Sequence, residues 1–242
     1  RQPRPAAQFD GTPLATAPIA PMLGEHGRGD VHGVRDNIAN DKKDYYDQWN
    51  PYLNSDEVPI SPYRVFTELM KAVNPRDAIV THDSGSPRDH LVPLYEATTP
   101  RGYIGWGHST QLGFSLGAAM GAKVAAPEKL VVNFMGDAAF GMVGMDVETA
   151  VREQIPILTL LLNNSAMGNY EQHIPKASER YGTKFLTGNY SDVARGLGAY
   201  AQRVEQPGEI TPALERAIRA TRDGKPALVE FITREEPDMA IG

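Results

Sequence analysis

The stretch from Met135 to Asn164 reads MGDAAFGMVGMDVETAVREQIPILTLLLNN. It begins at the last residue of the apolar run KLVVNFM and contains a second run, PILTLLL. Such near-continuous apolar runs are typical of strands buried on both faces. Between the two runs, apolar residues recur at helical spacing, at Phe140, Val143, Val147 and Val151. A strand–helix–strand unit of this kind has parallel strands, often neighbours in one sheet.

The rest of the chain from Pro59 continues this alternation. Helices are expected at SPYRVFTELMKAVN, with Ser61 as N-cap, Pro62 at the first helical position and an end before Pro75, and at LGFSLGAAMGAKVAA, SDVARGLGA and ITPALERAIRATRDG. Strands are expected at DAIVTH, YAQRV and PALVEFIT. This order predicts an α/β fold, a doubly wound parallel sheet over residues 59–242.

Residues 1–58 have a different character. They are rich in Pro, Gly, Asp and Asn and sustain no apolar period. We therefore expect an irregular N-terminal extension, either a linker or the tail of a preceding domain. The N-terminus has no initiator Met and no signal peptide, which suggests a processed product or the downstream part of a longer polypeptide.

Composition narrows the function classes. The net charge of −6 argues against a general nucleic-acid binder, whose affinity depends on clustered Lys and Arg. The absence of Cys excludes disulfides, thiolate metal sites and a catalytic Cys, and it fits a reducing compartment, so we expect a cytoplasmic protein. No apolar run approaches the ~20 residues of a membrane helix, so no membrane partner is expected.

Polar residues follow both strands of the opening stretch. Asp137 follows the first and Asn164 the second, so both should emerge at the carboxyl edge of the sheet, where such folds bind ligands. A carboxylate with amide and carbonyl oxygens suits Mg²⁺ or Ca²⁺, and Mg²⁺ usually keeps positions for phosphate or water. Gly136 and Gly141 allow close approach, and a helix beginning near Phe140 would direct free N–H groups to the same place. The pattern predicts a metal–diphosphate site; the alternative is two unrelated turns.

These residues also carry a family resemblance. The Gly-Asp-Ala start, the acidic helix and the closing Asn-Asn resemble the signature of thiamine diphosphate enzymes. The stretch is similar to the C-terminal, diphosphate-binding domain of the acetolactate synthase and pyruvate oxidase superfamily, and to oxalyl-CoA decarboxylase and 2-hydroxyacyl-CoA lyase. The resemblance covers roughly Pro59 to Thr233. It implies thiamine diphosphate and Mg²⁺ as cofactors, with FAD possible only in a middle domain outside this chain.

The resemblance assigns roles by matching position. Mg²⁺ would be held by Asp137, the Asn164 side chain and the backbone carbonyl of Ala166. Contacts to the cofactor would come from Gly85, Ser86, Gly136, Asp137, Ala138, Ala139, Met167 and Gly168.

Leu112 occupies the position of the apolar wedge that bends the cofactor, and the Thr110 carbonyl would accept a hydrogen bond from the pyrimidine amino group. The alternative for Leu112 is a core leucine on a helix. The four-residue spacing of Gly113, Gly117 and Gly121 is most simply a sign of tight helix packing.

Histidines are the candidates for acid–base work. We expect His108 and His173 near the substrate, and His82 and His90 in loops or at the surface. Asn169 stands where acetolactate synthases carry a Met, which argues against acetolactate synthesis. The sequence has no cluster of Lys and Arg near these loops that would indicate a binding site for a CoA nucleotide.

The resemblance implies a decarboxylase, carboligase or lyase that acts on a 2-oxo acid or related carbonyl compound. In this family a Glu of a pyrimidine-binding domain activates the cofactor, so we expect that domain from another subunit or another part of the polypeptide, in at least a dimer. Two alternatives remain open. One is a non-catalytic, cofactor-binding regulatory subunit; the other is an unrelated nucleotide-binding α/β domain, although the chain lacks GxGxxG and GxxxxGK[ST] loops.

Overall fold

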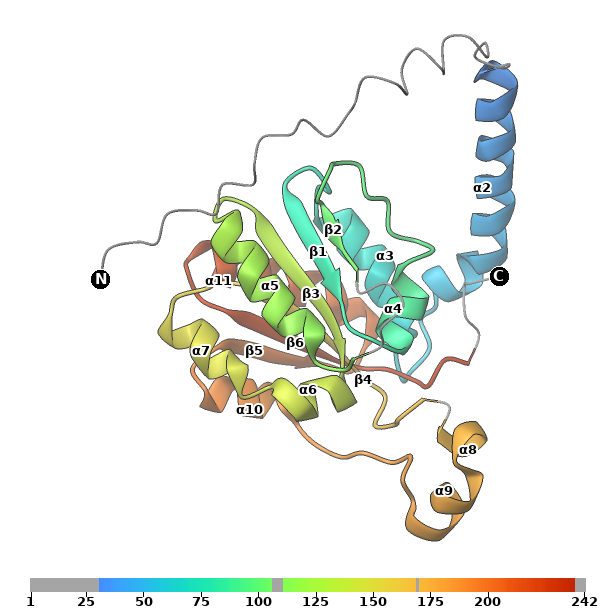
Figure 1. The fold of residues 1–242 in the computed structure, drawn as a ribbon. Helices are drawn as coiled ribbons and strands as arrows, with labels where there is room; N and C mark the ends of the chain where they lie inside the picture. Colours follow the sequence, from blue (N-terminus) through green and yellow to red (C-terminus); the bar gives the residue numbers. More distant parts are fainter. Residues whose placement is uncertain (1–30, 106–110, 169, 238–242) are drawn as a thin grey trace, which may run out of the picture. The chain divides into compact units, whose positions relative to one another are not determined.

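The structure is a computed structural model that describes residues 31–105, 111–168 and 170–237 (Figure 1). The chain divides into two compact units, Arg1–Gln48 and Trp49–Gly242. The second unit contains the sheet and every element discussed below except most of helix α2.

A six-stranded sheet in the order β2-β1-β3-β4-β6-β5 forms the centre of this unit, and all its strand pairs are parallel. Its strands are β1 (Ala78–His82), β2 (Tyr103–Ile104), β3 (Leu130–Gly136), β4 (Leu158–Asn163), β5 (Tyr200–Val204) and β6 (Ala227–Ile232). The two strands of the opening stretch, β3 and β4, are direct neighbours, with Val132 opposite Leu158.

Helices cover both faces of the sheet (Figure 1). One face carries α3 (Pro62–Ala72), α4 (Ser86–Leu91) and α11 (Ile210–Arg222); the other carries α5 (Phe114–Ala125), α6 (Asp137–Val143), α7 (Asp146–Arg152) and α10 (Tyr190–Gly196). On the first face the rings of Phe66 and Phe134 lie 4.7 Å apart. On the second, Leu116, Met135 and Leu161 belong to one buried cluster. The predicted doubly wound α/β fold is confirmed.

The predicted helix between β3 and β4 is two helices, so that prediction is wrong in detail. Helix α6 begins at Asp137 rather than near Phe140, and the chain turns at Gly144 before α7 begins. A Cβ at Gly144 would lie 2.5 Å from the Phe140 ring, so the turn requires glycine. The earlier start makes Asp137 itself the first helical residue.

Several short elements have no apolar period and were not predicted. They are β2, α4, α8 (Tyr170–His173), α9 (Pro175–Tyr181) and the 3₁₀ turn η1 (Pro207–Glu209).

The expectation of an irregular extension is wrong for helix α2 (Val31–Leu53). This helix is polar on nearly all sides, and an exposed Lys43–Asp47 pair one turn apart has a 2.7 Å separation. A helix without an apolar stripe gives no periodic signal, which is why the sequence pattern did not reveal it. None of the described helices is both long and apolar enough to cross a bilayer.

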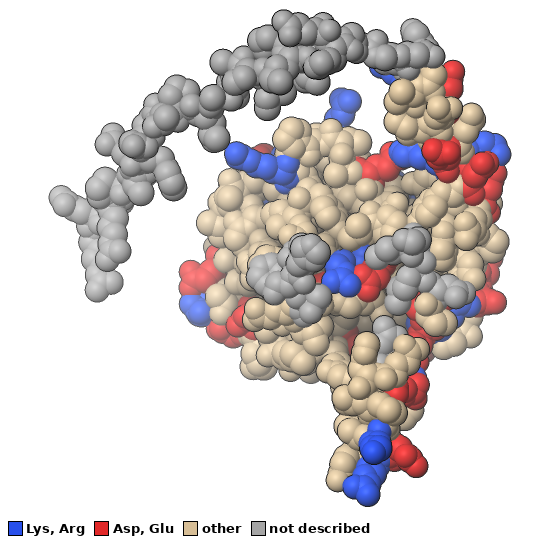
Figure 2. All heavy atoms as spheres, turned by 45° about the vertical axis from the view of Figure 1, so that its right-hand side comes forward, with Lys and Arg blue, Asp and Glu red and all other residues tan. Residues whose placement is uncertain are grey.

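Charge is mixed over the described residues that are visible in Figure 2. Lys and Arg side chains lie among Asp and Glu side chains, and this view shows no broad basic surface. The distribution agrees with the net charge of −6.

Truncation of Phe134 tests the packing of the first face. Phe134 is fully buried against Phe66, so Phe134→Ala should lower the free energy of unfolding by about 3–5 kcal/mol in urea denaturation. Val124→Ala is the control, because Val124 is 67% exposed on α5 and its truncation should have little effect. Equal stability of the two variants would contradict the described core.

Candidate functional site

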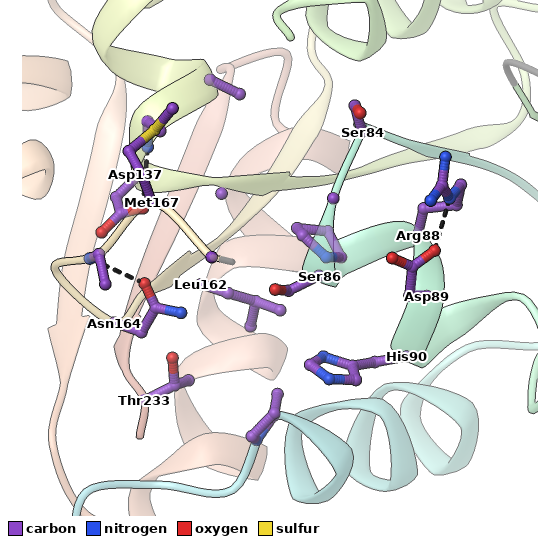
Figure 3. Close-up of a pocket in the computed structure, with 18 of the residues that line it drawn as sticks. Ser84, Ser86, Arg88, Asp89, His90, Asp137, Leu162, Asn164, Met167 and Thr233 are labelled. Carbon is purple, nitrogen blue, oxygen red and sulfur yellow. Dashed lines mark hydrogen bonds and ion pairs between the residues drawn. The ribbon is translucent and has the colours of Figure 1, made fainter. Parts of the chain in front are cut away.

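A cavity of about 380 Å³ lies at the carboxyl ends of β1, β3 and β4 (Figure 3). After β1 the chain enters α4 on one face of the sheet, and after β3 it enters α6 on the other. The two connections diverge, which opens a crevice between them at the switch point of the sheet.

The cavity brings together every predicted site residue that the structure describes. These are Gly85, Ser86, Leu112, Gly136, Asp137, Ala138, Ala139, Asn164, Ala166, Met167, Gly168 and His173. His108, Thr110 and Asn169 lie outside the described residues.

Asp137 is the buried charge of this cavity. Its side chain accepts the Ala138 N–H at 2.8 Å and the Ser165 N–H at 2.7 Å. Burial raises the pKa of Asp137 to about 6, although these backbone donors act in the opposite direction. Among the described residues no Lys, Arg or His forms an ion pair with it. A buried carboxylate without a cationic partner fits a bound cation, which would stabilise its ionised form.

Asn164 and Ala166, the other two predicted metal ligands, line the same cavity as Asp137. The Asn164 Oδ1 accepts the Ala166 N–H at 3.0 Å and retains a second lone pair. Figure 3 shows Asp137 and Asn164 on the same side of the cavity, next to Met167. The described part of the chain contains no group of three or more His, Cys, Asp or Glu side chains that could hold a metal. A cation bound at Asp137 would therefore need amide, carbonyl and ligand oxygens, as Mg²⁺ with a diphosphate does.

The chain matches the family described as "Thiamine pyrophosphate enzyme, C-terminal TPP binding domain" over residues 83–231. It belongs to this family of thiamine pyrophosphate enzymes.

Two curated relatives illustrate the similarity. A probable acetolactate synthase of Mycobacterium bovis is 33% identical over 228 residues, which cover 93% of this chain and 40% of that protein. A sulfoacetaldehyde acetyltransferase of Alcaligenes xylosoxydans xylosoxydans is 30% identical over 186 residues, 74% of this chain and 30% of that protein. The chain thus spans less than half the length of these relatives.

Asp83 does not line the cavity but supports one of its walls, and the sequence patterns did not reveal it. It is fully buried at the end of β1, and it accepts the Gly113 N–H at 3.0 Å, the Ser115 N–H at 3.1 Å and the Ser115 hydroxyl at 2.6 Å. It therefore joins the end of β1 to the turn that precedes α5. The available signal was an acidic residue directly after an apolar strand, the same signal that identified Asp137.

This turn presents Leu112 to the cavity. Leu112 lines the cavity and also packs against the buried cluster of the second face, but it precedes α5 and is not a core leucine on that helix. Gly113 has φ +92°, and a Cβ there would lie 2.5 Å from Val143, so only glycine fits after Leu112.

The prediction of tight packing is wrong for Gly117 and Gly121, because a Cβ at either would meet no atom of the described chain within 4 Å.

His82 and His90 are buried, contrary to the expectation of loop or surface positions. His82 is the last residue of β1, and its ring stacks on Tyr103 with centroids 5.4 Å apart. His90 lies in α4, contacts the ring of Tyr63 and lines the cavity; its Nε2–H donates to the Glu236 carbonyl at 3.3 Å. Burial lowers the pKa of both, that of His90 to about 4. His173 is exposed at the end of α8, at the cavity wall.

The buried His90 predicts a pH dependence of stability. Its pKa is about 4 in the folded state and about 6.5 in the unfolded state, so below pH 6.5 the unfolded state binds a proton that the folded state does not. The free energy of unfolding should fall as pH decreases, by about 2 kcal/mol from this residue between pH 7 and pH 5. Urea denaturation at both pH values measures the change. His90→Phe should reduce it, and an unchanged difference would contradict the assignment.

Proposed function

We propose that this chain supplies the diphosphate- and magnesium-binding half of the active site of a thiamine diphosphate-dependent enzyme that forms or cleaves carbon–carbon bonds. The observation that carries the proposal is the buried Asp137 carboxylate, placed beside Asn164 and Ala166 at the switch point of the sheet. A nucleotide-binding domain of an unrelated family is no longer an alternative, because the chain matches the thiamine pyrophosphate family.

Each part of the cavity has a role in this proposal. Asp137, the Asn164 side chain and the Ala166 carbonyl would hold Mg²⁺. Gly85 and Gly168 leave space for a diphosphate to approach the backbone, since neither carries a side chain. When bound, thiamine diphosphate supplies a nucleophilic carbon and stores the electron pair released in carbonyl chemistry. Leu112 would support the bent shape of the cofactor by its bulk.

The substrate in this proposal is a 2-oxo acid or a related carbonyl compound. The names of the relatives, an acetolactate synthase and an acetyltransferase, are consistent with transfer of a small acyl unit. We propose that a pyrimidine-binding domain, in another chain or another part of the polypeptide, completes the site in an oligomer.

Removal of the Asp137 carboxylate tests the metal site. In the complete protein, Asp137→Ala should abolish Mg²⁺-dependent binding of thiamine diphosphate, because the cation loses its charged ligand. Isothermal titration with and without Mg²⁺ measures this binding. Asp146→Ala is the matched control, since Asp146 is an exposed carboxylate on the nearby α7 and should bind like the wild type. Unchanged binding by Asp137→Ala would contradict the proposed magnesium site.

Truncation of Leu112 tests the wedge. Leu112→Ala should retain cofactor binding but lower kcat roughly 10- to 100-fold, because small displacements of reacting groups are costly. Met142→Ala removes a 60% exposed side chain and serves as the control. Full activity of Leu112→Ala would reject the wedge role. Absence of turnover in the wild type, coexpressed with a pyrimidine-domain partner, would favour a non-catalytic cofactor-binding subunit.

A further inference from the structure

Glu230 is a fully buried carboxylate that the proposed cofactor contacts do not use. It lies in β6, beside Leu161 of β4 and Arg203 of the edge strand β5 in the strand register. An apolar residue at this position would avoid the cost of burying a charge, so stability alone does not explain a glutamate here.

Two donors occupy the two oxygens of Glu230. The Asn163 Nδ2 donates to Oε1 at 2.7 Å, and the Ser191 N–H donates to Oε2 at 2.9 Å. The Arg203 guanidinium, at 3.4 Å from Oε1, supplies a partly exposed counter-charge. Because an ionised carboxylate only accepts hydrogen bonds, it holds the Asn163 amide with its nitrogen toward Glu230 and its oxygen away.

In this orientation the side-chain oxygen of Asn163 faces Ser165 and accepts hydrogen bonds from it. It accepts the Ser165 N–H at 3.0 Å and the Ser165 hydroxyl at 3.1 Å. The same Ser165 N–H also donates to Asp137 Oδ2 at 2.7 Å. A continuous hydrogen-bond chain thus runs from Glu230 through Asn163 and Ser165 to Asp137.

Within this hydrogen-bond chain, Ser165 is the residue with a strained backbone conformation. Its φ of +56° lies in the left-handed region, which a residue with a side chain adopts only when its surroundings impose it. It stands between Asn164 and Ala166, the two proposed metal ligands of the loop, so its conformation sets their directions. We call residues 164–166 the metal loop.

We propose that Glu230 is a positioning residue for the metal loop: by fixing the amide of Asn163, it holds Ser165 in the left-handed conformation that directs Asn164 and Ala166. Glu230 acts here without touching the metal or the cofactor. This inference rests on the proposed function, because it assigns Glu230 to the same metal site. Partners of this kind, which hold the ligands of a metal in place, commonly change metal affinity 10- to 100-fold when mutated.

Glu230→Gln in the complete protein tests the inference. Glutamine keeps the shape but has one acceptor oxygen where glutamate has two. The Asn163 amide and the Ser191 N–H can therefore no longer both donate to this side chain in the orientation seen here. At saturating thiamine diphosphate, the Kd for Mg²⁺ by isothermal titration should rise roughly 10- to 100-fold. In activity assays the Mg²⁺ concentration for half-maximal rate should rise likewise, with kcat at saturating Mg²⁺ close to that of the wild type.

Two further variants separate positioning from general stability. Thr159→Val alters another buried polar residue of β4, which bonds Asn133 at 3.5 Å, and it should leave the Kd for Mg²⁺ unchanged even where Tm falls. Asn163→Ala interrupts the chain at its next link and should raise the Kd as Glu230→Gln does. The double variant Glu230→Gln, Asn163→Ala should be no weaker than Asn163→Ala alone, since both act through one path.

The outcomes distinguish this inference from the proposed function. A wild type without Mg²⁺ affinity, or unchanged binding by Asp137→Ala, contradicts the proposed function. If both of those tests succeed, wild-type Mg²⁺ affinity in Glu230→Gln overturns the inference, whatever the change in Tm. If Glu230→Gln does not fold, folded Asn163→Ala decides in its place, and wild-type affinity in that variant overturns the inference equally.

Discussion

A carboxylate that is taken out of water must be surrounded by hydrogen-bond donors or by a cation, and this requirement shapes the carboxyl side of the sheet. Asp83, Asp137 and Glu230 are three of the carboxylates that are buried in the described part of the chain. Each takes its donors from a loop or helix start that is distant in sequence. Asp83 joins β1 to the start of α5, Asp137 joins β3 to the metal loop, and Glu230 joins β6 to the start of α10.

The three carboxylates differ in how completely they are satisfied. Asp83 receives donors from Ser84, Gly113 and both the backbone and the hydroxyl of Ser115, and Glu230 has two donors and the nearby Arg203. Asp137 has two backbone donors from other residues, and burial still raises its pKa to about 6. Asp137, which has only these two donors and no ion-pair partner among the described residues, is also the one of the three that lines the cavity. The fold thus uses two carboxylates to fix loops and leaves the third available to a ligand.

Much of the fold was predictable from local patterns. Apolar runs gave β1, β3, β4 and β6, and helical periodicity with a cap or a proline gave α3 and α11. Elements without these signals were missed: β2 is too short, and α2 is polar on nearly all sides and has no apolar stripe. The break between α6 and α7 was missed because the apolar period continues across Gly144 while the ring of Phe140 occupies the space of its missing side chain.

At the site, local sequence was enough to place Asp137 and Asn164 directly after strands of a parallel sheet, and the resemblance they carry identified the family. Both depend on residues that are close in sequence and on the general rule that parallel strands end at one edge. The roles of Asp83, His90 and Glu230 became visible only in the folded chain. The partners of these groups, Ser115, Tyr63 and Asn163, are brought to them by strand register and helix packing rather than by spacing along the chain. Whether a buried polar residue is structural or functional depends on those partners, and no local pattern contains them.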